Sequence, residues 1–286
     1  MVLCMVTRPA TEETAPRLGE GLSLRRMPAH WMLGRLGKRV MRPGGFGPSE
    51  RMIEALEIGP ADDVVEMWPG LGRTAALALA GQPASYIGVE RGEAEAARAR
   101  QALHGPTQRC LVAPTHRTGL DDGCASVVYG EALLTLEPAP RKVDIVGEAA
   151  RLLRPGGRYG VHELLLTPDG LSEAAKSEIQ TALTKVLRVG ARPLTRTEWH
   201  RLLSDGGFRV QTEETGPLLL LDPRTFLADE GVSGTAMFLG RAVRSPEVLP
   251  RLVTILRTFH RYREHIGAIT FVADRGGRAS SAPPRT

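Results

Sequence analysis

Residues 62–75 read DDVVEMWPGLGRTA, a short apolar run followed by a turn with two glycines and the start of an alanine-rich segment. Valine favours a β-strand, and alanine is the strongest helix former. Glycines at such a turn let a ligand approach the backbone closely, and the N-terminus of the following helix offers unpaired N–H groups to an anion. The stretch therefore predicts a strand, a ligand-binding turn and a helix.

The same alternation continues along the chain. Further strand-like runs rich in Val, Ile and Tyr cover residues 85–89, 125–129 and 157–166. Helical stretches rich in Ala and Leu cover residues 73–80, 93–103 and 141–153. Strands and helices that alternate at this spacing indicate β-α-β units, so we expect an α/β fold, doubly wound around a mostly parallel sheet.

The second half of the sequence is less regular. Residues 171–189 have the length and period of a helix, and Thr195 with Glu198 has the spacing of a capping box. Strands are predicted at 208–212 and 266–273, with a helical insert between them at 223–262.

These patterns predict one domain with two polar ends. Residues 1–24 are expected to form a flexible leader and residues 275–286 a disordered tail. The single domain, 25–274, then contains an N-terminal helical lid at 25–58, a core at 59–166 and a C-terminal part at 167–274.

Composition limits the class of protein. The chain has 286 residues, of which 42% are hydrophobic and 24% charged, enough to bury one full core. The longest strictly apolar runs are a few residues, such as 218–221, far short of the roughly 18 that cross a bilayer. Cys4, Cys110 and Cys124 have no C-x-x-C spacing, which suits a reducing compartment. We expect a cytoplasmic protein without a membrane partner or a zinc site.

The charge distribution offers a second possible partner. The net charge is +5, and residues 25–51 hold seven basic residues against Glu50 alone. Such a segment can bind nucleic acid. Its apolar residues also recur at helical spacing, which is typical of a docked amphipathic helix with a solvated basic face. Nucleic acid is therefore possible as a partner but not favoured.

Two acids at predicted strand ends separate the possible ligands. Glu66 closes the first strand before the turn, where its carboxylate would repel a pyrophosphate and suit a cationic ligand. Glu90 ends the next strand, eighteen residues after Gly72, where a doubly wound fold presents an acid to ribose hydroxyls. Two further motifs are GLDDG at 119–123, which leads into a strand, and ARLLRPGGR at 150–158, a helix that ends in a Pro-Gly-Gly turn.

Together these motifs resemble the S-adenosylmethionine-dependent methyltransferases of the Rossmann-like class. The resemblance covers residues 53–166 and, less closely, 194–210 and 266–273. It implies a mostly parallel seven-stranded sheet with an N-terminal helical segment and a helical insert before the last strand. It also implies S-adenosylmethionine as cofactor and methyl transfer to a small-molecule acceptor.

The resemblance also implies roles for particular residues. In the family, the strand-end acid and the glycine turn hold the methionine moiety, the second acid binds both ribose hydroxyls, and a later loop flanks the adenine. The positions beside the transferred methyl group follow the fourth strand. The cofactor-binding residues implied in this way are Glu66, Trp68, Pro69, Gly70, Gly72, Glu90, Thr115, Leu120 and Gly130.

A general base is needed only if the acceptor is protonated. The ends of the fourth and fifth strands open onto the ligand crevice in such sheets, so the candidate catalytic residues are Glu131 and His162. Glu163 is considered as well, although a strand-end structural role explains it better.

Departures from the family pattern motivate the alternatives. Trp68 stands where the family has its first glycine, and Pro114 stands where many members have an aspartate. A methyltransferase-like protein that binds a ligand without turnover is one alternative, and an RNA methyltransferase is another. An NAD-dependent oxidoreductase is the least favoured. Gly70, Gly72 and Ala75 fit the dinucleotide spacing, but Glu66 opposes a pyrophosphate and no tyrosine has a lysine four residues later.

Overall fold

The structure is a computed structural model that describes residues 19 and 21–276. Most of the predicted leader and all but two residues of the predicted tail therefore lie outside the described residues. Among the described residues, no helix combines the length and the apolar character that crossing a bilayer requires.

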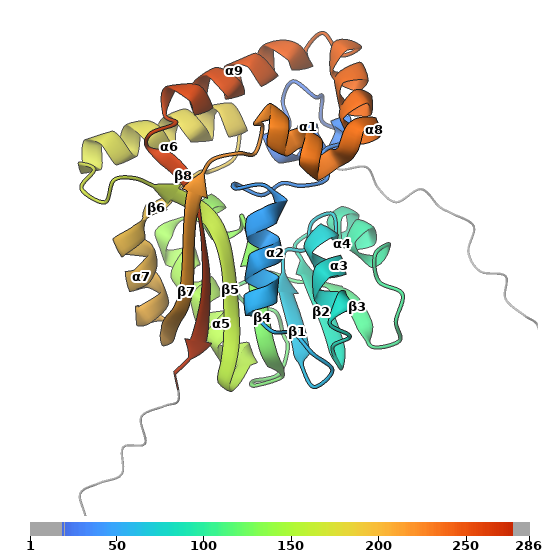
Figure 1. Ribbon diagram of the computed structural model, residues 1–286, viewed down its shortest axis with the longest axis vertical. Helices are drawn as coiled ribbons and strands as arrows, with labels where there is room; N and C mark the ends of the chain where they lie inside the picture. The colour runs from blue at the N-terminus through green and yellow to red at the C-terminus, as the bar shows by residue number, and fades with distance from the viewer. Residues whose placement is uncertain (1–18, 20, 277–286) are drawn as a thin grey trace, which may run out of the picture.

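A central sheet organises the described chain (Figure 1). Its strands run in the order β3-β2-β1-β4-β5-β8-β7, and β6 pairs with β5 off this path. The strands are β1 Asp63–Met67, β2 Ser85–Glu90, β3 Gln108–Val112, β4 Ala125–Glu131, β5 Leu153–Leu166, β6 Leu194–Thr195, β7 Phe208–Pro217 and β8 Ile266–Arg275. All neighbours from β3 to β5 are parallel, whereas β8 is antiparallel to both β5 and β7. The predicted α/β fold with a mostly parallel sheet is confirmed.

Helices cover both faces of the sheet and one of its ends. They are α1 Ala29–Leu36, α2 Phe46–Ala55, α3 Arg73–Ala80, α4 Glu93–Arg100, α5 Ala139–Leu152, α6 Glu173–Leu187, α7 Arg196–Asp205, α8 Pro223–Val243 and α9 Val248–Arg261. A short 3-10 helix, η1, spans Leu134–Leu136. The capping box at Thr195 is present and begins α7 as predicted.

The alternation of side-chain direction along the central strands explains why helices pack on both faces of the sheet. Val64 of β1 packs in a cluster with α2 and α3, whereas its neighbour Val65 packs in a cluster with α5 and α7. Val127 and Val128 of β4 divide between the same two clusters. Because successive side chains of a strand point to opposite faces, a continuous valine run buries both faces of the sheet.

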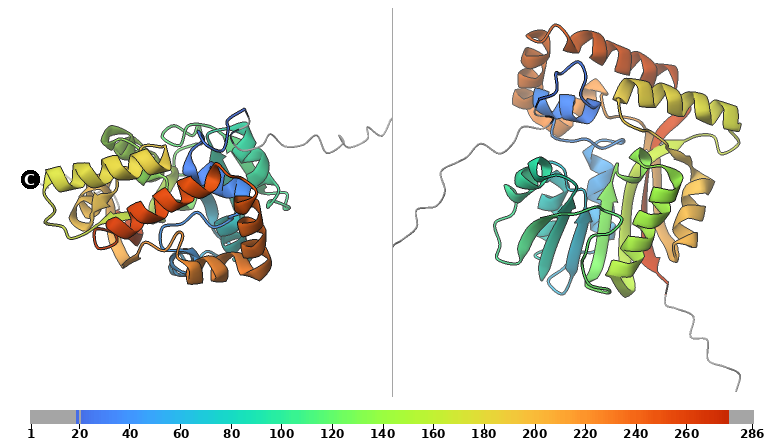
Figure 2. Two further views of the ribbon diagram at one scale, coloured as in Figure 1. Left: turned by 90° about the horizontal axis from the view of Figure 1, so that it is seen from above. Right: turned by 180° about the vertical axis from the view of Figure 1, so that it is seen from behind.

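A separate helical layer lies over one end of the sheet (Figures 1 and 2). The N-terminal helix α1 and the insert helices α8 and α9 share one buried cluster that includes Leu33, Phe238 and Ile255. The two helical segments that the sequence predicts at opposite ends of the domain therefore pack against each other. The turn that follows β1 and the end of β4 face this layer.

Candidate functional site

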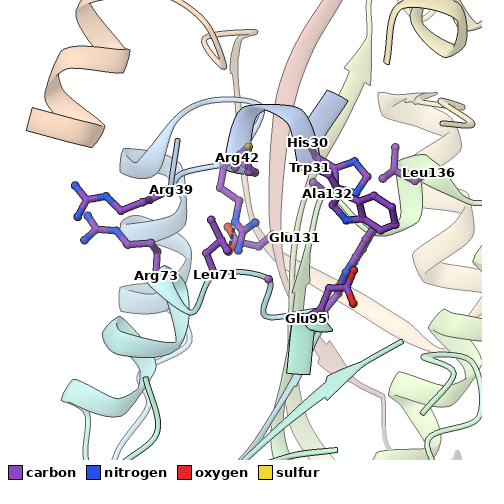
Figure 3. Close-up of a pocket in the computed structure, with 14 residues that line it drawn as sticks. His30, Trp31, Arg39, Arg42, Leu71, Arg73, Glu95, Glu131, Ala132 and Leu136 are labelled. Carbon is purple, nitrogen blue, oxygen red and sulfur yellow. Dashed lines mark hydrogen bonds and ion pairs between the residues drawn. The ribbon is translucent and has the colours of Figure 1, made fainter. Parts of the chain in front are cut away.

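A cavity lies between helix α1 and the ends of β1 and β4 (Figure 3). Aromatic and aliphatic side chains line it together with three arginines and two glutamates. The lining residues are His30, Trp31, Gly34, Arg39, Met41, Arg42, Trp68, Gly70, Leu71, Arg73, Glu95, Glu131, Ala132 and Leu136. Predicted site residues Trp68, Gly70 and Glu131 are thus brought together, and α1 closes the cavity from above.

The turn after β1 has left-handed backbone at three positions, with φ of 68° at Trp68, 63° at Gly70 and 72° at Gly72. A β-carbon added to Gly70 would meet no atom within 4 Å, so this backbone borders open space. A β-carbon at Gly72 would come within 2.9 Å of the Ala102 side chain. Gly70 therefore leaves room for a ligand, and Gly72 permits close packing under the turn.

Trp68 takes a conformation that is rare for a bulky residue. Its side chain lines the cavity, and the Arg91 guanidinium lies 4.4 Å from the centre of its ring. The centre of the His30 ring lies 6.0 Å from that of the indole, in an edge-to-face arrangement. Arg91 is itself paired with Glu137 at 2.7 Å. These contacts hold the indole at the ligand-facing side of the turn.

Glu90 lies beneath this turn and is completely buried. One carboxylate oxygen, Oε1, accepts a hydrogen bond of 2.6 Å from the Gly70 N–H. The other, Oε2, is buried and has no hydrogen-bond partner among the described residues. Burial raises the pKa of Glu90 to about 8. A buried acceptor without a donor calls for a ligand that supplies one.

Glu66 points away from the cavity. Its carboxylate accepts hydrogen bonds from the hydroxyl groups of Tyr86 and Tyr129, and the side chain is 1% exposed. Burial raises its pKa to about 7. Glu66 does not line the cavity, so the structure does not bring it to the place where the resemblance expects contact with the methionine moiety.

Glu131 is held by a buried polar network. Its Oε2 accepts hydrogen bonds from Arg42 Nε at 2.6 Å and from Thr74, and its Oε1 accepts one from Ser49. Burial alone would raise the pKa of Glu131, but the Arg42 charge and the hydrogen bond from His162 outweigh burial and hold this pKa far below its usual range. Glu131 is therefore a fixed anion at the cavity wall and a weak proton acceptor.

His162 lies behind Glu131. Its Nδ1 is 3.0 Å from Glu131 Oε1, its Nε2 faces the Gly44 N–H at 3.4 Å, and its side chain is fully buried. The structure thus brings the two predicted catalytic residues into contact. Only Glu131 lines the cavity.

Besides Glu66, Gly72 and Glu90, four more predicted cofactor residues do not line the cavity. Thr115 is buried, and Leu120 packs partly buried against the main core. Pro69 is buried against the sheet, close to Gly88. At Gly130 an added β-carbon would lie 3.1 Å from the Met67 carbonyl oxygen, so this glycine allows β4 to pack closely on β1.

The sequence did not single out His30, Arg42 or Arg73. All three line the cavity, and Arg42 comes from the basic segment 25–51. Four of the seven basic residues in that segment are paired with carboxylates within the fold. Lys38 and Arg39 pair with Glu230, Arg42 with Glu131, and Arg51 with Glu214. The basic composition was visible in the sequence, but the partners of these residues were not.

Comparisons with known proteins agree with this architecture. Residues 68–161 match a family described as a methyltransferase domain. An uncharacterized protein of Haemophilus influenzae is 28% identical over 221 residues, covering 76% of this chain and 86% of that protein.

Solved structures share the fold. A cyclopropane synthase from Mycobacterium tuberculosis matches with a TM-score of 0.65 at 15% identity, over 85% of this chain and 93% of that one. A geranyl diphosphate C-methyltransferase from Streptomyces coelicolor A3(2), solved with S-adenosyl-L-homocysteine, matches with a TM-score of 0.57 at 18% identity, over 79% of this chain and 74% of that one.

The sheet order, the glycine turn and the domain match together define the class. Over residues 68–161 the chain carries a methyltransferase domain, and the described chain has the Rossmann-like fold of the matched structures. The resemblance inferred from residues 53–166 is confirmed at this level.

Proposed function

We propose that the protein transfers the methyl group of S-adenosylmethionine to a small-molecule acceptor held between α1 and the end of β4. The observation that carries this proposal is the unpartnered Oε2 of Glu90, buried under the open turn at Gly70. The vicinal hydroxyl groups of a ribose would supply the hydrogen-bond donors that this oxygen lacks. A doubly wound fold binds ribose through an acidic residue at the end of its second strand, which is the position of Glu90.

The residues present fit the cofactor. Glu90 would accept hydrogen bonds from the ribose, and the open backbone at Gly70 would lie against the methionine moiety. Trp68 would lie against the same moiety on the side of the cavity. When bound, the cofactor supplies an activated methyl group on a sulfonium.

The chain's own contribution is positioning and electrostatics. In an in-line displacement the acceptor's lone pair forms the new bond to carbon while the carbon–sulfur bond breaks, so alignment and exclusion of water supply much of the acceleration. Glu131 offers a fixed negative charge on the cavity wall, which favours a cation nearby. Its low pKa makes it a poor base.

The acceptor side is largely apolar. A second cavity shares His30, Met41, Ala132 and Leu136 with the first and continues between Leu164 and Phe259. We therefore assign it to an acceptor with an apolar body. His30 lines both cavities, and burial lowers its pKa to about 4, so its imidazole is neutral at pH 7. His30 is thus better placed than His162 to contact a polar group of the acceptor.

Calorimetric titration with S-adenosylmethionine, with S-adenosylhomocysteine and with NADH tests the cofactor assignment. We expect micromolar binding of the first two and none of NADH. Glu90→Gln should weaken binding at least tenfold, and Glu214→Gln, at an exposed glutamate that lines no part of the cavity, serves as the matched control. Absence of binding in protein that melts cooperatively would overturn the assignment.

A second candidate, ligand binding without turnover, is favoured by one observation. Trp68 occupies the cavity side of the turn at a position where its backbone is strained. Mass-spectrometric detection of S-adenosylhomocysteine during incubation with a library of small apolar acceptors separates the two. Release that depends on one acceptor supports transfer, whereas tight cofactor binding with no release across the library supports the second candidate.

A further inference from the structure

A separate hollow, apart from the two cavities described above, lies where the segment before α1 meets helices α6 and α9. Its volume is about 590 Å³, and it shares no lining residue with the methyltransferase cavity. Its apolar lining consists of Ala182 and Val186 of α6 and Pro250 of α9. This hollow is therefore distinct from the site described above.

The charged residues around the hollow are mostly of one sign. Four cations line it, namely Arg25, Lys185, Arg188 and Arg251, against the single carboxylate of Glu247. None of the four forms an ion pair within 4 Å in the part of the chain that the structure describes. The threonine hydroxyls beside them donate to carbonyl groups of α9 itself. The four cations thus outnumber the one carboxylate that lines the hollow.

Arg251 is the most constrained of the four. Its Nη1 donates to the Leu24 carbonyl oxygen, which fixes the guanidinium between α9 and the N-terminal segment. Its Nη2 is buried and has no acceptor among the described residues. Burial and the neighbouring charge of Arg188 lower the pKa of Arg251. A buried guanidinium nitrogen that has no acceptor and lies beside a second arginine is unfavourable unless a ligand supplies a hydrogen-bond acceptor.

Local helix electrostatics do not account for this arrangement. Lys185 lies in the last turn of α6, where the helix dipole favours a cation. Arg251, in contrast, is the fourth residue of α9, near the end where the dipole favours an anion. Arg188 follows α6 with a left-handed backbone, φ 56°, which directs the chain into the hollow's rim. The helix dipoles therefore do not stabilise all four cations of the hollow.

We propose that this hollow binds a small molecule through its phosphate group, with Arg251 and Arg188 as the principal donors and Lys185 and Arg25 neutralising the remaining charge. The planar guanidinium fork matches two phosphate oxygens, and a doubly charged group suits a cluster of four cations better than a single carboxylate does. Only ten residues line the hollow, and this small extent favours a compact ligand over a long polyanion.

Calorimetric titration of the full chain with inorganic phosphate at low ionic strength tests the proposal. We expect saturable one-to-one binding that weakens with added salt. Arg251→Gln and Lys185→Gln should each weaken binding about tenfold. Arg257→Gln, on the same helix but outside the hollow, is the matched control and should leave binding unchanged. Lys185 lies on the surface, so this variant keeps the test valid if Arg251→Gln fails to fold.

Two further probes identify the source of the phosphate group. Phenyl phosphate should bind at least as tightly as inorganic phosphate if the ligand is a small phosphomonoester, and a short oligouridylate should not. Non-saturable binding, an equal loss in Arg257→Gln, or preference for the oligouridylate would each overturn the proposal. Glu90→Gln should leave phosphate binding intact, so the result is independent of the cofactor assignment.

Discussion

Glu131 Oε1 lies 3.0 Å from His162 Nδ1, and the side chains of both residues are fully buried. Arg42 approaches the opposite oxygen of the same carboxylate at 2.6 Å. The carboxylate is therefore enclosed by donors on every side except the one that faces the cavity. This arrangement fixes a negative charge at the cavity wall and leaves His162 without access to a ligand.

Replacing Glu131 by Gln should destabilise the protein strongly. Arg42 would remain buried without its counterion, and removing one partner of a buried pair costs about 3–5 kcal/mol. Urea denaturation measures the free energy of unfolding. Glu214→Gln removes an exposed pair with Arg51 and should cost less than about 1 kcal/mol. Equal losses in the two variants would contradict the structural role of Glu131.

Replacing His162 by Gln should change stability more than catalysis. The imidazole is buried behind Glu131 and lines no part of the cavity, so no acceptor proton can reach it. We expect a moderate loss of stability in thermal melts, and an unchanged pH profile of S-adenosylhomocysteine release. His30→Gln, at the cavity wall, is the comparison. If the pH profile of the His162→Gln variant lost a titrating limb, His162 would again be a candidate general base.

Cofactor affinity should rise with pH through Glu90. Burial raises the pKa of Glu90 to about 8, so its carboxyl group is mostly protonated in the free protein at pH 7. Ribose hydroxyls donate to the ionised form and therefore favour it. Binding should then release a proton and tighten between about pH 6 and pH 8. Calorimetry in buffers of different ionisation enthalpy counts the proton, and in Glu90→Gln both effects should disappear.

Stability should fall over a similar pH range because of Glu66. Its pKa in the folded protein, about 7, lies above the ordinary value of 4.5, so the folded state binds the proton more tightly than the unfolded state does. The stabilisation is complete below the ordinary pKa and is lost as pH rises through about 7. Glu66→Gln should reduce the fall in melting temperature between pH 5 and pH 8, and the fall that remains comes from Glu90. A curve as steep as that of the unmodified protein would show that Glu66 does not titrate there.

The sequence predicted those elements whose pattern is strong. β1 and α3 begin and end where the valine run and the alanine-rich segment do, because each pattern is local and unambiguous. β3 was not predicted. At the edge of the sheet only Cys110 of Gln108–Val112 is buried, so the segment carries no alternation of apolar and polar residues.

The residues of the candidate site also fall into those that the sequence predicts and those that it does not. Strand ends are visible in the sequence, which is why Glu90 and Glu131 were placed at the crevice. Arg42 and Ser49 were not, since they reach Glu131 across 89 and 82 residues of chain. Their position depends on how α2 and the segment before it dock on the sheet, and no local pattern encodes that docking. The same holds for Glu66, whose rotation toward Tyr86 and Tyr129 follows from packing.

Trp68 offers the sharpest test of whether the pocket is built for the cofactor. Glycine accepts the left-handed backbone at this position, so Trp68→Gly relieves about 1–2 kcal/mol of strain. It also removes the cation–π contact with Arg91, worth about 0.5–1 kcal/mol, and it loosens the unfolded chain at a further cost of about 0.4–1 kcal/mol. These three terms nearly cancel, but the indole also packs against the main core, so the loss of that apolar contact should leave Trp68→Gly less stable than the unmodified protein in urea denaturation.

Trp68→Ala is the matched control, because it removes the ring but keeps the strained backbone. It should be about 0.5–1 kcal/mol less stable than Trp68→Gly, because the strain that glycine relieves exceeds the cost of a looser unfolded chain. Both variants should bind S-adenosylmethionine more weakly than the unmodified protein, since the ring that bounds the cavity is absent in each. If both bind it more tightly, the indole obstructs the cofactor, and ligand binding without turnover becomes the better account of this protein.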